Sequence, residues 1–156
     1  MEVSIIIPVL NEATNVGLIA KEIDDYCKQH HEIIFVDDGS TDDTFLNIQA
    51  LAETHSHIKC LSFSRNFGHQ NAIMAGLTQA GGHSIIIMDG DLQHPPALIP
   101  ELLHMLAKGY DVVNTKRLST ENVGILKSAS SSLFYFLINK ISKSSTADGS
   151  SSSIEG

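Results

Sequence analysis

Four acidic side chains stand directly behind two of the most apolar runs of the sequence. Asp37 and Asp38 follow one of these runs, and Asp89 and Asp91 follow another. Carboxylates gathered in one place raise one another's pKa and oppose folding unless a cation lies among them. Because residues i and i+2 of an extended loop point the same way, the spacing Asp89-Gly90-Asp91 suits a hard divalent ion such as Mg²⁺ or Mn²⁺. These residues therefore predict a metal site with open coordination positions for phosphate oxygens.

Each acidic pair also has a purely structural interpretation. Asp37 and Asp38 could belong to a loop in which Ser40 and Asp43 cap the next helix as a capping-box-like pair. That interpretation does not account for two adjacent acids directly behind a buried strand, so we favour a binding role. The second pair could lie in a solvated turn, but the motif that surrounds it favours a metal site.

The hydrophobic pattern of the first 115 residues predicts strands that alternate with helices. Ile-rich and Val-rich runs predict strands at 3–9, 33–36, 58–63, 84–88 and 110–114. Apolar residues at helical spacing predict helices within 12–29, 42–54, 69–80 and 97–108. Near-continuous apolar strands with short strand–helix–strand links indicate an α/β fold whose parallel sheet is covered on both faces. Ligands of such sheets bind beyond the carboxyl ends of the strands, which is where both acidic pairs should meet.

The composition fits one globular domain that does not bind nucleic acid as its main partner. The 156 residues are 42% hydrophobic and carry a formal net charge of −8. No apolar run approaches the roughly 20 residues of a membrane span, and the start of the chain does not look like a secretory signal. We expect a cytoplasmic protein, with association at a membrane surface left open.

The cysteines and four of the histidines are expected to be structural. Cys27 and Cys60 are predicted to be small core residues rather than disulfide partners. We expect solvated positions at helix ends and linkers for His30, His31, His55 and His57. Their spacing to the cysteines is not that of a zinc site.

Beyond residue 115 the sequence changes character. We predict a core domain at 1–120, a further helix at 121–141 on the acceptor or membrane side, and a Ser-rich disordered tail or linker at 142–156.

Four segments in this order carry a family resemblance: SIIIPVLNE, IIFVDDGSTDDT, SRNFGHQNAIMAGL and IIIMDGDLQHPP. Together they resemble the inverting glycosyltransferases of family 2 over about residues 2–120. The third segment is similar to the branch that loads a sugar onto polyprenyl phosphate, such as bactoprenol glucosyltransferases and dolichol-phosphate mannosyl synthases. The resemblance implies the GT-A fold, a Rossmann-like three-layer α/β/α arrangement with a mostly parallel sheet.

The resemblance also implies roles for individual residues. Asp38 corresponds to the acid that contacts the base or ribose, and Arg117 to a basic residue that meets a phosphate of the acceptor or donor. Asp91 and Arg117 would be catalytic. Mg²⁺ or Mn²⁺ would be held by Asp89, Asp91 and Gln93. The nucleotide-sugar would be bound by Pro8, Asn11, Glu12, Asp37, Asp38, Arg65, Gly68, His69, Asp89 and Gly90.

The implied reaction moves a sugar from a UDP- or GDP-sugar to a polyprenyl (undecaprenyl or dolichyl) phosphate at the cytoplasmic face of a membrane. A divalent cation neutralises the diphosphate leaving group. The acceptor phosphate, with a second pKa near ~6, is already mostly ionised at pH 7. Positioning and electrostatics then matter more than a strong base, and we expect displacement with inversion.

The sequence departs from the family pattern at His94, where many relatives carry Asp, and in its length. Relatives run well beyond this length, so we expect a fragment or truncated form. One alternative is a remnant that binds a nucleotide-sugar without transferring it. A second alternative is a receiver-like phospho-acceptor domain, suggested by the acidic pocket and Lys116 but disfavoured because no acidic pair follows the first strand. The sugar, the nucleobase, the acceptor and the oligomeric state stay open.

Overall fold

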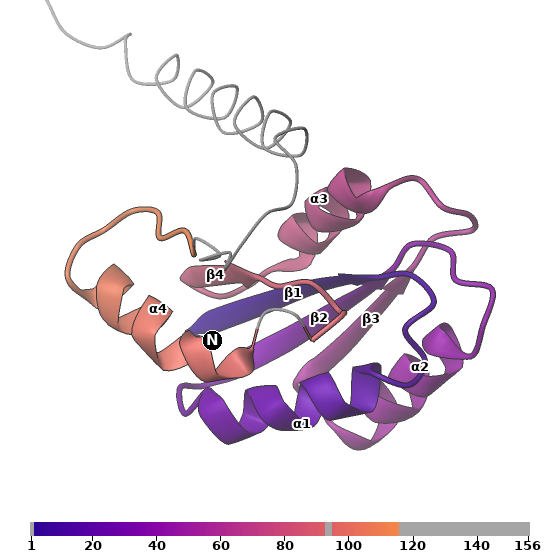
Figure 1. Ribbon diagram of the computed structural model, residues 1–156, viewed down its shortest axis with the longest axis horizontal. Coiled ribbons are helices and arrows are strands. Elements are labelled where there is room, and N and C mark those ends of the chain that lie inside the picture. The colour runs from indigo at the N-terminus through magenta and orange to yellow at the C-terminus, as the bar shows by residue number, and fades with distance from the viewer. Residues whose placement is uncertain (1, 93–94, 116–156) are drawn as a thin grey trace, which may run out of the picture. The chain divides into compact units, whose positions relative to one another are not determined.

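A computed structural model of the chain describes residues 2–92 and 95–115 (Figure 1). Its elements lie in one compact unit, Met1–Asn114. The strands are β1 (Val3–Val9), β2 (His31–Asp37), β3 (Ile58–Ser62) and β4 (Ser84–Ile87). The helices are α1 (Val16–Tyr26), α2 (Thr44–Thr54), α3 (His69–Gln79), the short 3₁₀ helix η1 (Pro96–Leu98) and α4 (Ile99–Ala107).

The described strands form one parallel sheet in the order β3-β2-β1-β4. The chain steps from β1 outward to β3 and then crosses back over β1 to β4. Connections between parallel strands are right-handed. Connections that step in opposite directions along the sheet therefore place their helices on opposite faces. Figure 1 shows α1 and α2 on one face and α3 on the other, which confirms the predicted α/β/α layers.

This strand order also decides between two of the candidate folds. It matches the first four strands of the Rossmann order, in which β1 lies between β2 and β4. Receiver domains have β1 between β2 and β3. The receiver-like alternative is therefore wrong.

Each face of the sheet has its own hydrophobic core because successive residues of a strand point to opposite sides. On the α1 and α2 face, Ile5, Ile7 and Phe35 are fully buried and pack with side chains of both helices. On the α3 face, Ile6 and Ile34 pack with α3. Burial of each such side chain contributes about 1.5–3 kcal/mol to folding, so these runs hold the sheet in place.

A buried carboxylate lies among the apolar residues of the α3 face. Glu32 is 1% exposed. One oxygen accepts hydrogen bonds from the Ser4 hydroxyl (2.6 Å) and the Gly81 amide (2.7 Å), and the other lies 2.6 Å from Lys59 Nζ. Burial alone raises the pKa of Glu32, but these partners outweigh it and hold the pKa below its usual value. The network joins three strands and the turn that precedes β4.

Three differences from the sequence-based prediction are informative about the described residues. Residues 110–114 form no strand, and Tyr110 and Val112 are 55% and 69% exposed. An apolar run becomes a strand only where a neighbouring strand accepts its backbone hydrogen bonds, and no described strand pairs with this segment. α1 begins only at Val16, because residues 12–15 form a turn. β2 begins at His31, which pairs with Val3 of β1.

Candidate functional site

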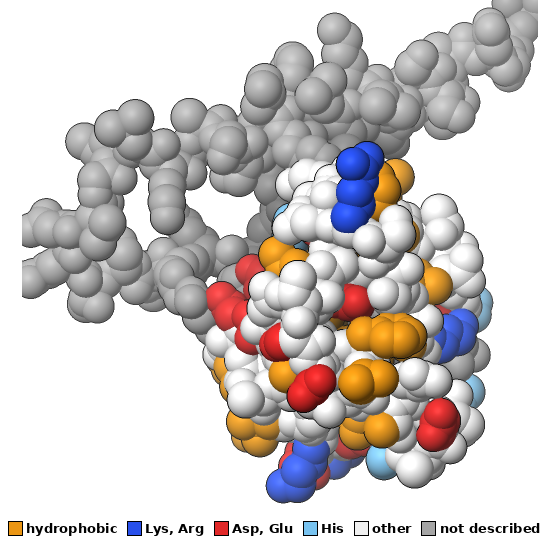
Figure 2. Space-filling view, turned by 90° about the vertical axis from the view of Figure 1, so that its right-hand side faces the viewer, with side chains coloured by type: hydrophobic (Ala, Val, Ile, Leu, Met, Phe, Trp, Pro, Cys, Tyr) orange, Lys and Arg blue, Asp and Glu red, His pale blue; other side chains and the backbone are white. Residues whose placement is uncertain are grey.

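The loops that follow the strands come together at one side of the sheet, which we call the carboxyl edge. It comprises residues 10–15, 38–43, 63–68 and 88–92. The loops after β1, β2 and β3 lie at the right of Figure 1, and Figure 2 looks onto that side. Acidic side chains gather on this face among polar and hydrophobic ones (Figure 2). The predicted binding residues of the described chain all lie in or next to these loops.

Asn11 joins the first loop to the second. Its backbone amide donates a hydrogen bond to the Ser40 hydroxyl (2.9 Å), and its side-chain carbonyl accepts one from the backbone amide of Thr41 (2.9 Å). Asn11 has a left-handed backbone with φ 56°, a conformation that asparagine tolerates better than most residues. In the next residue, the Glu12 amide donates to the Thr44 hydroxyl (2.8 Å). The first loop is thus held by polar contacts before any ligand binds.

Asp42, which precedes the first turn of α2, joins that turn to the first loop. Its Oδ1 accepts hydrogen bonds from the amide of Thr44 (3.0 Å) and from the Thr44 hydroxyl, and its Oδ2 accepts from the Ala13 amide (3.3 Å). These bonds, above all the one from the Thr44 hydroxyl, lower the pKa of Asp42. The capping-box pair of Ser40 and Asp43, which the sequence analysis considered as the structural alternative, is not formed: Asp43 makes no capping bond, and the Ser40 hydroxyl accepts a hydrogen bond from the Asn11 backbone amide.

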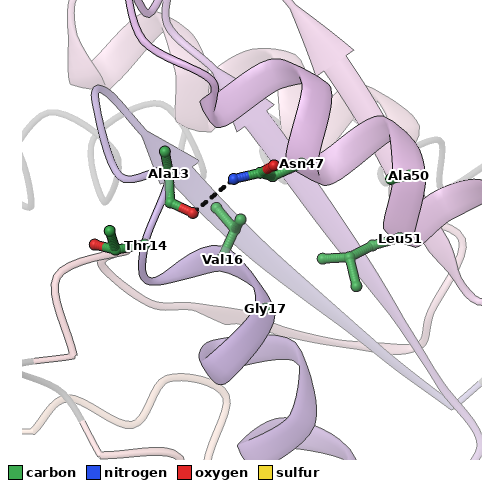
Figure 3. Close-up of a pocket in the computed structure, with 7 residues that line it drawn as sticks. All are labelled: Ala13, Thr14, Val16, Gly17, Asn47, Ala50 and Leu51. Atoms are coloured by element: carbon green, nitrogen blue, oxygen red, sulfur yellow. Dashed lines mark hydrogen bonds between the residues drawn. The ribbon is translucent and has the colours of Figure 1, made fainter.

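A shallow pocket of about 310 Å³ lies beside this contact, between the start of α1 and α2 (Figure 3). Asn47 donates a hydrogen bond to the Ala13 carbonyl across it (2.8 Å). Its other lining residues are small or apolar: Thr14, Val16, Gly17, Ala50 and Leu51. None of the acidic residues of the predicted site lines this pocket, so it offers no charged group for binding.

Asp37 ends β2 and is 2% exposed. Its Oδ1 accepts from the Ser40 amide (3.0 Å) and its Oδ2 from the Ser62 hydroxyl (2.9 Å). A buried carboxylate needs such donors, because burial without them costs several kcal/mol. Asp37 therefore ties the second loop to the end of β3. Ser62 was not among the predicted site residues, and no feature of its local sequence points to it.

Asp38 is 4% exposed and connects the second loop to the third. Its two oxygens accept from consecutive amides, those of Phe67 (2.8 Å) and Gly68 (3.0 Å). The two loops also touch at Gly39, where φ is 73° and an added Cβ would lie 2.3 Å from the Arg65 carbonyl carbon. Asp38 thus sets the conformation of the loop that leads into α3.

Arg65 and Gly68 lie in this third loop. Arg65 is exposed, and its guanidinium lies over the Phe67 ring, 4.8 Å from the ring centre. Gly68 adopts φ 96°, which favours glycine, and has no atom within 4 Å of an added Cβ. Glycine at 68 therefore serves the backbone turn before α3 rather than close packing.

The fourth loop carries the Asp89-Gly90-Asp91 motif and packs on the end of β1. A Cβ added at Gly90 would lie 2.6 Å from Val9 Cγ1, so only glycine lets the loop approach β1 this closely. Leu92, just after the motif, has φ 59°, a left-handed conformation that costs on the order of 1–3 kcal/mol and often occurs at functional sites.

A continuous series of contacts links the two acidic pairs. Asp38 accepts from the Gly68 amide, and the next residue, His69, has its Nε2 3.5 Å from Asp89 Oδ1. Both pairs therefore lie at the carboxyl edge, as the parallel sheet predicts. Gln93 and Arg117 lie outside the described residues, as do His94 and Lys116.

The donor set at the fourth loop has the chemistry of a hard-cation site. The Asp89 side chain is 42% exposed and Asp91 is exposed, so both carboxylates are accessible from solvent. Carboxylate oxygens in an accessible loop are the ligands that Mg²⁺ and Mn²⁺ prefer. Asp89 and Asp91 thus fit the predicted metal.

Within the part of the chain that the structure describes, no helix is long and apolar enough to cross a membrane.

Comparison with known sequences gives a family match over almost the whole chain. The model of glycosyl transferase family 2 matches residues 4–153. The putative glycosyltransferase CsbB of Bacillus subtilis is 43% identical over 150 residues, which cover 94% of this chain and 45% of that protein. The undecaprenyl-phosphate 4-deoxy-4-formamido-L-arabinose transferase of Yersinia pestis is 44% identical over 133 residues, 83% of this chain and 41% of that protein. The chain thus spans less than half the length of these relatives.

A solved structure shares the fold. It is the mannosyltransferase PcManGT from Pyrobaculum calidifontis, in complex with GDP-Man and Mn²⁺. The TM-score is 0.60 at 28% sequence identity, over 68% of this chain and 32% of that protein. The predicted GT-A arrangement is confirmed.

Proposed function

The chain belongs to glycosyl transferase family 2, and from this premise we propose that it moves a sugar from a nucleotide-diphosphate sugar to a polyprenyl phosphate. The observation that carries the proposal is the series of contacts that brings Asp38, His69 and Asp89 to one edge of the sheet. In an open sheet of this strand order, that edge is where a nucleotide binds.

The donor side of the proposal rests on the loops of the carboxyl edge. We assign the nucleotide to the surface formed by Pro8, Asn11, Glu12, Asp37, Asp38, Arg65, Gly68, His69, Asp89 and Gly90. Asp38 already accepts two backbone hydrogen bonds, so its first role is to shape the third loop. A contact from Asp38 to the base or ribose would use the remaining lone pairs of its oxygens. PcManGT was solved with GDP-Man, which supports a nucleotide-sugar as donor.

Asp89 and Asp91 would hold a divalent cation, with Gln93 as a further ligand. Bound Mg²⁺ or Mn²⁺ would act as a Lewis acid that neutralises the diphosphate of the leaving group. PcManGT was solved with Mn²⁺, which supports this choice of cation. The close packing of Gly90 on Val9 holds the backbone between Asp89 and Asp91 against the end of β1, which supports a preformed position for these two residues.

The acceptor side of the proposal rests on the chemistry of phosphate and on the relatives. An acceptor phosphate that is ionised at neutral pH needs orientation rather than deprotonation, which agrees with inverting displacement at the anomeric carbon. We assign Asp91 and Arg117 to the catalytic centre, with Arg117 facing a phosphate. The Yersinia pestis relative is named for transfer involving undecaprenyl phosphate, which supports a polyprenyl phosphate acceptor. We assign the reaction to the cytoplasmic face of a membrane.

The proposal is tested by calorimetric titration of UDP and GDP into the chain with and without Mn²⁺. We expect one of the two nucleotides to bind, with affinity that depends on the cation. Asp91→Asn should reduce the gain in nucleotide affinity that Mn²⁺ provides by more than about tenfold. Asp25→Asn is the matched control, because Asp25 is an exposed residue of α1. Absence of binding by both nucleotides, or equal affinity of Asp91→Asn and the wild type, would contradict the proposal.

A second candidate function is nucleotide-sugar binding without transfer. The contacts that run from Asp38 through His69 to Asp89 belong to the donor side, which this function shares with the first. Incubation with labelled donor and a short polyprenyl phosphate separates the two candidates. Labelled glycolipid indicates transfer, whereas binding with no glycolipid, or slow hydrolysis of the donor alone, indicates the second function.

A further inference from the structure

Three metal-ligating side chains meet at the opposite side of the sheet, which we call the amino edge. Asp24 Oδ1 lies 3.0 Å from His31 Nε2 and 2.9 Å from His57 Nε2. One ligand atom from each of the three residues lies within 4.8 Å of the other two. The two imidazole rings meet edge to face, with centroids 5.3 Å apart. The sequence analysis expected these histidines to be solvated, but their side chains are only 11% and 28% exposed.

Regular structure rather than a mobile loop positions this cluster. Asp24 lies in the last turn of α1, His31 is the first residue of β2, and His57 immediately precedes β3. The Ile33 amide donates to the His57 carbonyl (2.9 Å), which continues the pairing of β2 with β3 up to the cluster. Ligands held on strand ends and a helix keep their spacing without a bound ion, which lowers the cost of binding.

The contacts of His31 leave a place for a proton or a cation between its ring and Asp24. Nδ1 of His31 lies 2.9 Å from the Gln29 carbonyl oxygen, which can only accept, so Nδ1 carries a proton. The other ring nitrogen, Nε2, faces a second acceptor, the Asp24 carboxylate. A neutral imidazole has only one N–H, so Nε2 can bond to the Asp24 carboxyl group only through a further proton or through a metal ion. A bond from Nδ1–H to a backbone carbonyl is the usual outer-shell contact of a metal-binding histidine.

The spacing of the ligand atoms is close to that of a tetrahedral zinc site. Zinc bonds of about 2.0–2.1 Å at tetrahedral angles place neighbouring ligand atoms about 3.3 Å apart. The two separations from Asp24 Oδ1 are 3.0 and 2.9 Å, so each imidazole nitrogen needs to move away from this oxygen by only a few tenths of an ångström. The ligand atoms of the two histidines lie within 4.8 Å of each other. The Asp24 side chain is 37% exposed, which leaves a path from solvent for the ion and for a water as fourth ligand.

We propose that Asp24, His31 and His57 form a second metal site, specific for a divalent transition-metal ion of the zinc type. Two imidazoles favour Zn²⁺ or Co²⁺ over Mg²⁺, whereas the all-oxygen donors of Asp89 and Asp91 favour Mg²⁺ or Mn²⁺. The ion would link the end of α1 to the starts of β2 and β3. By mass action it would stabilise the folded chain, independently of sugar transfer.

Spectroscopic titration of Co²⁺ into the untagged chain of 156 residues tests the site. We expect one equivalent to bind with the visible absorption of four-coordinate Co²⁺, Zn²⁺ to displace it, and Mg²⁺ to leave it in place. Zn²⁺ should also raise the melting temperature. His31→Gln and His57→Gln should each weaken binding by more than about tenfold. His55→Gln is the matched control: His55 packs edge-on against His57 but bonds to the Leu51 carbonyl.

The result that overturns the proposal is Co²⁺ binding that is absent, or equally strong in His31→Gln, His57→Gln and His55→Gln. If a histidine variant loses its helical circular dichroism, Co²⁺ binding is compared between Asp24→Asn and its control Asp25→Asn. Equally strong binding in these two variants would overturn the proposal. Asp91→Asn must leave the Co²⁺ spectrum unchanged, because Asp91 belongs to the carboxyl edge. Loss of the spectrum in Asp91→Asn would place the ion there and overturn the proposal.

Discussion

The two edges of the sheet use aspartate in different ways. At the carboxyl edge, Asp37 and Asp38 are buried and accept hydrogen bonds from amides and a hydroxyl of neighbouring loops. At the amino edge, Asp24 is partly exposed and faces two imidazoles. A carboxylate that accepts hydrogen bonds from backbone amides holds loops together. A carboxylate that faces imidazoles offers, together with them, oxygen and nitrogen ligand atoms. The partners, rather than the residue type, therefore decide what each carboxylate can do.

The edges also differ in what positions their side chains. The carboxyl edge is built from four loops that hold one another, so its shape depends on a few buried polar contacts. The amino edge is built from the ends of α1, β2 and β3, so its shape follows from the packing of the sheet. Loss of one polar contact should therefore lower the stability more at the carboxyl edge than at the amino edge, and the first three predictions below test that difference.

The largest effect is expected from Asp38→Ala. The substitution leaves the half-buried amides of Phe67 and Gly68 without their acceptor, which should lower the free energy of unfolding by about 2–4 kcal/mol. Urea unfolding followed by circular dichroism measures it. Asp43→Ala is the control, since Asp43 is exposed and makes no capping bond, and it should change stability by less than about 0.5 kcal/mol. Equal effects of the two substitutions would refute the bracing role of Asp38.

A glycine pair compares backbone packing at the two edges. Gly39→Ala combines φ 73° with a Cβ 2.3 Å from the Arg65 backbone and should cost about 2–3 kcal/mol. Gly81 precedes β4 at the amino edge, and its added Cβ would lie 3.5 Å from Glu32 Oε1, an ordinary contact. Gly81→Ala should therefore stay within about 0.5 kcal/mol of the wild type in the same urea assay. A Gly39→Ala variant as stable as Gly81→Ala would show that the second and third loops can separate freely.

Glu32→Gln should lower stability at pH 7 by about 1–2 kcal/mol, because the amide keeps the volume but loses the ion pair with Lys59. The pKa of Glu32 is lowered in the folded chain, so its contribution is present above the unfolded value of 4.5 and is lost as pH falls through the folded value. Thermal melts from pH 7 to pH 3 should show a shallower decline for Glu32→Gln than for the wild type. Parallel curves would mean that Glu32 contributes nothing to the acid sensitivity.

The smallest effect concerns the influence of the negative charge of Asp37 on the pKa of Cys60. Burial, followed by the negative charge of Asp37, raises the pKa of Cys60 to about 11. At pH 8 its thiolate fraction should be roughly a hundredfold below that of a cysteine with the ordinary value of 9.0, and alkylation correspondingly slow. Asp37→Asn should speed alkylation of Cys60 slightly, as peptide mapping by mass spectrometry would show. A rate as high as that of free cysteine would contradict this account.

Much of the fold follows from local patterns. The bounds of β1 were predicted correctly, and the predicted helices around α2 and α3 differ from the observed ones by at most two residues at each end. The segment 110–114 was predicted wrongly because an apolar run does not show whether a partner strand lies beside it. The histidines of the amino edge were misjudged for a similar reason: no spacing along the chain relates His31 to His57, which become neighbours only when β2 pairs with β3.

The order of elements, the parallel sheet and the location of the acidic pairs at strand ends were all contained in the amino-acid sequence. Hydrophobic periodicity is a property of neighbouring residues, so it can be read without coordinates. The hydrogen-bond partner of each carboxylate was decided by the tertiary structure. Asp38 meets Phe67 across 29 positions and Asp24 meets His57 across 33, and such pairs are selected by strand order and register. Burial then makes each choice energetically decisive, because a carboxylate removed from water must find its donors within the fold.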